Sequence, residues 1–254
     1  MNYSLIQNLK STTNECLIIG FYSDEKLPLD LDKQSSYVVA SLCLKAQEPG
    51  DMRWMQDKDC SILVIQCGPK SNFDLNQLQK RLAEITDFLI TQRITTASLC
   101  FPAMLNYSKD AQLEHMLLKV DHQLYQFLDF KKKNPKPHAL KSLDFYLPGA
   151  DEQTIHKAQA IADSVSFTRN LGNMPANICT PTYLGEQAEA LAKHYPKLSC
   201  KVLGPEDMKK LGMNTLLAVS QGSIQPPRLI ELSYQGGGKS APIALVGKGI
   251  TFDS

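Results

Sequence analysis

Apolar residues along the chain alternate between short continuous runs and longer stretches in which they recur every three or four positions. The runs Cys16–Tyr22 and Ser61–Cys67 contain no charged residue, which predicts strands buried on both faces. Asp74–Gln92 and Lys109–Phe130 carry a helical apolar stripe instead, and Ile94–Phe101 predicts a further strand between them. This alternation predicts an α/β fold, with a largely parallel or mixed sheet that helices cover.

A connection rich in lysine and proline interrupts the alternation at Lys131–Pro137. Its two prolines and four lysines cannot continue a helix, so they predict a solvated connection between domains. We therefore expect an N-terminal mixed-sheet α/β domain over residues 1–140. A linker strand and helix over 141–172 and a second α/β domain over 173–254 would follow it.

The C-terminal region is short for the number of strands that its pattern predicts. These strands are Ser199–Leu203, Leu216–Ser220, Arg228–Tyr234 and Ile243–Val246. A parallel sheet needs helices on both faces, and few helical segments separate these strands. We therefore expect the second α/β domain to be incomplete within this chain.

Composition and charge indicate a soluble globular protein. Hydrophobic residues make up 43% of the chain, and the net charge of +1 provides no excess positive charge for binding a polyanion such as nucleic acid. The segment Met1–Glu15 lacks the apolar stretch of a secretory signal, and no apolar run approaches the roughly 20 residues that a membrane helix needs. Seven cysteines without CxxC spacing indicate free thiols. These features favour a cytoplasmic protein without a membrane partner.

The segment Val246–Ser254, Val-Gly-Lys-Gly-Ile-Thr-Phe-Asp-Ser, carries the strongest chemical signal in the chain. It directly follows the predicted strand Ile243–Val246, and ligands of open α/β sheets bind at the carboxyl ends of such strands. Lys248, as a neutral amine, and Asp253, as a carboxylate, are suited to share a divalent cation. Without further information, a lysine after a strand is more often a surface cation or a phosphate contact.

Val246–Ser254 resembles the metal-binding signature of the leucyl aminopeptidase (cytosol aminopeptidase) family, which reads V-G-K-G-[ILV]-[TV]-F-D-[ST]. A second stretch, Arg169–Pro181, is similar to the R-x-L-x-N-x-P-[AGPS]-N-x-x-x-P segment of that family, and the two motifs occur in the expected order. The resemblance implies an N-terminal domain, a linker helix and the beginning of a catalytic domain with a metallo-exopeptidase fold.

The same resemblance implies a specific chemistry. Lys248 and Asp253 would bind one of two divalent ions, Mn²⁺ or Zn²⁺, which activate a water molecule and polarise the scissile carbonyl. The enzyme would release leucine-like N-terminal residues from peptides with a free N-terminus, as a cytoplasmic homohexamer. The remaining ligands and catalytic groups of the family lie downstream of Ser254, so we expect no catalytic residue within this chain. Two ligands cannot hold a dinuclear centre, and the chain alone should therefore be inactive.

Other interpretations use the same residues differently. A non-catalytic module for oligomerisation, regulation or nucleic-acid binding is the alternative to the enzyme, although the lysine cluster at 131–136 is better explained as a solvated linker. A nucleophilic Cys-His enzyme is a further alternative, but no cysteine lies in a recognisable activating setting. For Asn173–Pro181, a structural role in shaping a turn is favoured over substrate contact by Asn177.

Overall fold

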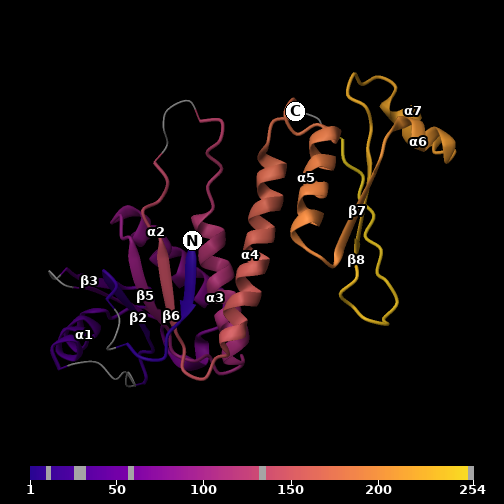
Figure 1. Cartoon of the computed structure of the whole chain (residues 1–254). Coiled ribbons are helices and arrows are strands. Elements are labelled where there is room, and N and C mark those ends of the chain that lie inside the picture. Colours follow the sequence, from indigo (N-terminus) through magenta and orange to yellow (C-terminus); the bar gives the residue numbers. More distant parts are fainter. Residues whose placement is uncertain (10–12, 26–32, 57–59, 132–135, 251–254) are drawn as a thin grey trace. The chain divides into compact units, whose positions relative to one another are not determined.

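The computed structural model describes residues 1–9, 13–25, 33–56, 60–131 and 136–250. The chain divides into two compact units, Met1–Thr168 and Arg169–Ser254, and the division falls within helix α4 (Glu152–Asn173). The α/β fold class is as predicted (Figure 1). The sequence predicted domain boundaries after residues 140 and 172, whereas the two compact units divide after Thr168. The predicted domain boundaries stay a prediction.

The first unit is built on a six-stranded sheet. Its strands, in chain order, are β1 (Asn2–Leu5), β2 (Cys16–Phe21), β3 (Met52–Met55), β4 (Ser61–Gln66), β5 (Thr96–Cys100) and β6 (Ser142–Tyr146). In the sheet they lie in the order β1-β6-β5-β2-β4-β3. All neighbours are parallel except β3, which pairs with β4 in the antiparallel direction at one edge. The strand expected in the linker, β6, pairs with β1 and β5 inside this sheet.

The central strand β2 is buried on both faces. All six of its residues are buried, and its parallel neighbours are β4 and β5. Cys16 and Ile18 belong to the larger hydrophobic core on one face, whereas Leu17 and Ile19 belong to the smaller core on the other. Successive side chains of a strand point to opposite faces, so a strand with two covered faces must be apolar throughout.

Helices supply the cover on each face. Helices α2 (Leu75–Thr91) and α3 (Lys109–Leu124) contribute to the larger core, and α1 (Lys33–Lys45) contributes Val39 and Leu42 to the smaller one. The apolar stripes of α2 and α3 are fully buried at Leu78, Leu82, Ile85, Leu89, Leu113, Met116, Leu117 and Val120. Helix α4 adds Ile155, Ala158 and Ala162 to the same core.

Two of these helices begin at side-chain caps. Asp74 accepts a hydrogen bond from the Gln77 amide at 2.8 Å, and Ser108 accepts one from the Ala111 amide at 3.1 Å. Helix α3 ends at Leu124, before the Phe130 that the apolar stripe predicted, because Tyr125 takes an extended conformation with φ −58° and ψ 131°.

The second unit contains an antiparallel pair of strands, β7 (Leu198–Leu203) and β8 (Leu229–Tyr234). Its further helices are α5 (Pro181–His194), α6 (Pro205–Lys210) and α7 (Asn214–Ser220). The strand predicted at Leu216–Ser220 is wrong, since these residues lie in α7. A short apolar run does not distinguish a strand from a helix, and leucine and alanine favour the helix here.

The close approach of Gly20 to an aromatic ring leads to a stability prediction. A Cβ on Gly20 would lie 2.9 Å from Cδ1 of Phe101, whose ring is buried and stacked on Phe73. We expect Gly20→Ala to lower the free energy of unfolding of the first unit by about 1–3 kcal/mol, measured by urea denaturation. Gly222→Ala, whose Cβ would meet nothing within 4 Å, is the matched control. Equal stability of Gly20→Ala and the parent chain would contradict this packing.

Candidate functional site

The lysine motif lies in a segment that forms neither helix nor strand, residues 241–250. Ile243, Leu245 and Val246 are 89%, 95% and 97% exposed, so the prediction of a buried strand at Ile243–Val246 is wrong for this structure. A strand buried on both faces needs hydrogen-bonding neighbours and covering helices. The described part of the second unit offers only the β7–β8 pair as a sheet.

The two predicted metal ligands are therefore not brought together. Lys248 is exposed in this segment, and Asp253, with the rest of 251–254, lies outside the described residues. Among the residues that the structure describes, no group of three or more histidine, cysteine, aspartate or glutamate side chains is able to hold a metal ion. The described residues by themselves do not fit a dinuclear centre, and no catalytic step follows from them alone. The ligation by Lys248 and Asp253 stays a prediction.

The second motif, Arg169–Pro181, spans the end of α4 and the start of α5. The amides of Ile178 and Cys179 both donate to the Pro175 carbonyl at 2.9 Å, which closes a tight turn between the helices. Thr180 then caps α5 by accepting from the Tyr183 amide at 3.2 Å, and a proline occupies the first helical turn. These contacts support the structural role that the sequence favoured for this segment.

Four cysteines lie in settings that strongly suppress thiolate formation. Burial raises the pKa of the Cys16, Cys67 and Cys100 thiols to about 12 each, and that of Cys43 to about 11. A nucleophilic cysteine needs the opposite shift, towards neutral pH. The geometry therefore disfavours these thiols as nucleophiles of a Cys-His enzyme.

His115 and His194 contact residues that are close to them in sequence. The His115 ring packs edge-on against Tyr107 at a centroid distance of 6.2 Å, and His194 Nδ1 lies 2.8 Å from the Ala190 carbonyl oxygen. Burial lowers the pKa of the His138 imidazole below its usual range. None of these side chains belongs to a metal-binding group among the described residues.

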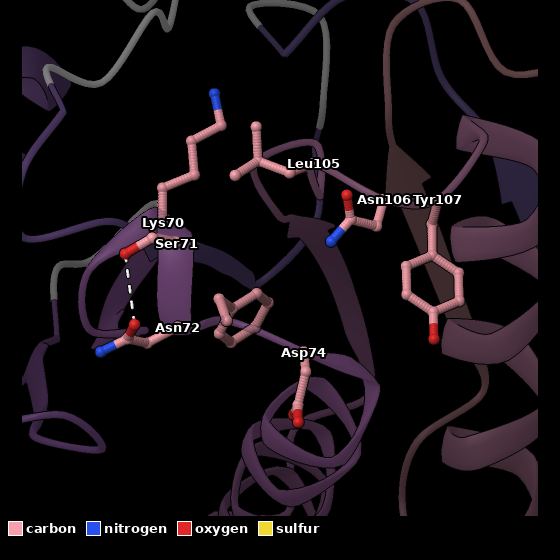
Figure 2. Close-up of a pocket in the computed structure, with 8 residues that line it drawn as sticks. Lys70, Ser71, Asn72, Asp74, Leu105, Asn106 and Tyr107 are labelled. Atoms are coloured by element: carbon pink, nitrogen blue, oxygen red, sulfur yellow. Dashed lines mark hydrogen bonds between the residues drawn. The ribbon is translucent and has the colours of Figure 1, made fainter.

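A hollow of about 480 Å³ lies in the first unit, and sequence reasoning did not find it (Figure 2). Its lining follows the carboxyl ends of two strands that flank β2, and consists of Lys70, Ser71, Asn72, Phe73 and Asp74 after β4 and of Leu105, Asn106 and Tyr107 after β5. The sequence feature that could have predicted this hollow is the position of both segments shortly after apolar runs, because ligands of α/β sheets bind at the carboxyl ends of strands. Sequence alone does not show that the two segments face each other.

Comparisons with a family model, with curated sequences and with solved structures all point to the family that the sequence motifs resemble. Residues 166–254 match the family model described as the cytosol aminopeptidase family, catalytic domain. A probable cytosol aminopeptidase of Legionella pneumophila (strain Paris) is 50% identical over 258 residues, which cover 100% of this chain and 53% of the relative. A probable cytosol aminopeptidase of Nitrosococcus oceani is 37% identical, covering 94% of this chain and 51% of the relative.

Solved structures share the fold. A tomato leucine aminopeptidase variant superposes with a TM-score of 0.81 at 23% identity, covering 100% of this chain and 55% of that one. The bottromycin maturation enzyme in complex with Mn gives a TM-score of 0.66 at 20% identity, covering 86% of this chain and 45% of that one. At these identities the likeness shows the fold alone.

The α/β fold is shared with the solved neighbours, and residues 166–254 match a catalytic-domain model. The chain belongs to the cytosol aminopeptidase family and spans about half the length of the curated relatives that it matches. None of the helices in the described ranges has the length and apolar character to cross a membrane.

The raised thiol pKa values give a testable reactivity. We expect iodoacetamide to alkylate Cys16, Cys67 and Cys100 at least about tenfold more slowly in the native chain than in guanidinium near neutral pH, because burial removes both access and thiolate. Peptide mapping by mass spectrometry measures the labelling at each site. Equal rates in the native and denatured chain at any of the three would contradict the burial described above.

Proposed function

We propose that this chain supplies the N-terminal domain and the beginning of the catalytic domain of a leucyl-type metalloaminopeptidase. The observation that carries the proposal is the motif Val246–Ser254, which lies inside the residues matched by the family's catalytic-domain model. The chain spans about half the length of its relatives, so this activity is assigned to a polypeptide that also contains the second half of the domain.

In that polypeptide, Lys248 and Asp253 would bind one of two divalent ions, Mn²⁺ or Zn²⁺. The Mn complex of the bottromycin maturation enzyme, which shares the fold, supports manganese as the first metal to test. A bound metal pair would supply Lewis acidity towards the scissile carbonyl and an activated water. Lys248 ligates as the free amine, whereas Asp253 contributes an anionic oxygen donor.

The substrates would be peptides with a free N-terminus, with leucine-like residues released first. The name of the tomato neighbour, a leucine aminopeptidase, supports this preference. The relatives' name, cytosol aminopeptidase, supports a cytoplasmic location. Assembly as a homohexamer is part of the same proposal and rests on the motif resemblance.

A non-catalytic role for the first unit is the second candidate. The net charge of +1 does not favour nucleic-acid binding. The hollow at the carboxyl edge of the sheet favours a role in binding a small ligand instead.

The isolated 254-residue chain provides the first test. We expect it to show no hydrolysis of leucine p-nitroanilide, with or without added Mn²⁺, because two ligands do not hold a dinuclear centre. Release of p-nitroaniline is followed by absorbance. Turnover by the pure chain that Lys248→Ala abolishes would show that the catalytic centre is complete without further residues.

The second test uses a polypeptide that includes the remainder of the catalytic domain. Asp253→Ala and Lys248→Ala should each lower metal affinity by at least about 10–100-fold, the cost of losing even an outer-shell partner, and reduce turnover together with it, because each removes a metal donor. Titration with Mn²⁺ or Zn²⁺ measures the affinity. Lys239→Ala, which changes an exposed lysine outside the motif, is the matched control. Unchanged metal stoichiometry and kcat in Asp253→Ala would remove this residue from the site.

A further inference from the structure

The strand β1 (Asn2–Leu5) holds the first residues of the chain inside the sheet, and it is the indigo strand beside the mark N in Figure 1. It pairs in parallel with β6, in a register that places Asn2 opposite Ser142. The backbone bonding begins at the first residue of the strand, since the Asn2 amide donates to the Lys141 carbonyl at 3.0 Å. The main chain is therefore committed to the sheet from Asn2 onwards.

Tyr3 anchors this strand to the body of the first unit. Its side chain is 8% exposed and belongs to the larger core, where its ring lies 6.0 Å from that of Phe145 between centroids. Its hydroxyl donates a hydrogen bond to Asp121 Oδ1 of α3 at 2.9 Å. If β1 leaves the sheet, it exposes this ring to water and breaks this hydrogen bond, so the opening of the strand is unfavourable.

Further contacts hold the strand on either side of Tyr3. The Met1 carbonyl accepts from Gln159 Nε2 of α4 at 3.3 Å, and the Ser4 hydroxyl donates to the Asp144 carboxylate of β6. The strand is thus tied to two helices and to its neighbouring strand, and these ties must yield together before it detaches.

A paired strand is a poor substrate for an exopeptidase. An aminopeptidase must take the terminal residue and the peptide bond after it into its active site, and a strand bonded to its neighbour offers neither. Cleavage then proceeds through a locally opened state, and its rate falls with the population of that state. Residues 1–9 contain no proline that would block trimming chemically, so any protection of this segment comes from the fold.

We propose that β1 is a structural stop for N-terminal trimming. Aminopeptidases remove the residues ahead of the strand, but none of Asn2–Leu5 while the first unit is folded. The stop acts on whatever residues precede Asn2, so it does not depend on where the polypeptide begins. The stop follows from the contacts of β1, whereas its use rests on the proposed function, because it would protect copies of an aminopeptidase from one another's active sites.

An unrelated aminopeptidase of broad specificity, added to the 254-residue chain, tests the proposal. The same chain extended by Leu-Ala-Leu-Ala ahead of Met1 and a synthetic peptide of residues 1–9 are treated alongside, and mass spectrometry follows the residues lost. We expect removal of the extension, and release of Asn2 at least about tenfold more slowly from both folded chains than from the peptide. Release of Asn2 with less protection than this would overturn the proposal. An extension that resists removal would also overturn it, because the block would then lie outside β1.

Asp121→Ala tests the anchor without changing the sequence that is trimmed. It removes the acceptor of the Tyr3 hydroxyl, and alanine suits the helix α3. Because the buried hydroxyl loses its partner, Asn2 should be released at least about fivefold faster than from the parent chain. Asp129→Ala changes an exposed aspartate that follows α3 and is the matched control, with the rate of the parent.

Tyr3→Phe keeps the ring and removes the hydroxyl, so it should behave as Asp121→Ala does, and far-UV circular dichroism shows that each variant is folded. Parent-like release from both folded variants would overturn the anchor and the proposal with it. Since the aminopeptidase is supplied separately, the result is independent of the activity of the longer protein. Protection of β1 without such activity would overturn only the proposed function, and activity without protection would overturn only the stop.

Discussion

Burial of β2 on both faces is the constraint on which the first unit depends. A strand with no polar side requires hydrogen-bonding neighbours on both edges and helices on both faces. β4 and β5 supply the neighbours, and α1, α2 and α3 supply the cover. The hollow lies between the segments that follow β4 and β5, the two strands on either side of β2.

The sequence predicted the buried interior of the first unit better than its edges. β2 and the middle of β4 are continuous apolar runs, and every residue of both strands is buried. β1 and β3 were not predicted, because four residues of mixed polarity become a strand only through pairing with β6 and β4. The apolar run at Ile243–Val246 was predicted as a strand but is not one in this structure, because it lacks neighbouring strands to pair with.

The candidate sites divide in the same way. The metal motif is contiguous in sequence, so the sequence alone identifies Lys248 and Asp253 as candidate ligands. The described residues do not fix the positions of these two side chains relative to each other. The hollow is a long-range feature, built from segments after β4 and β5 that are about thirty residues apart in sequence. Only the order of strands in the sheet brings them together, and periodicity carries no information about that order.

The pairing of β1 with β6 sets the order in which the protein completes its sheet during synthesis. Ser4 and Asp144 face each other across a sequence separation of 140 residues. A ribosome releases β1 first, so this strand has no partner until nearly the whole first unit has emerged. The closure of so long a loop makes β1 a late addition during folding. A chain that stalls before Ser142 would expose the apolar edge of β5 to other nascent chains, and aggregation in that interval is the cost of an N-terminus placed at the far edge of the sheet.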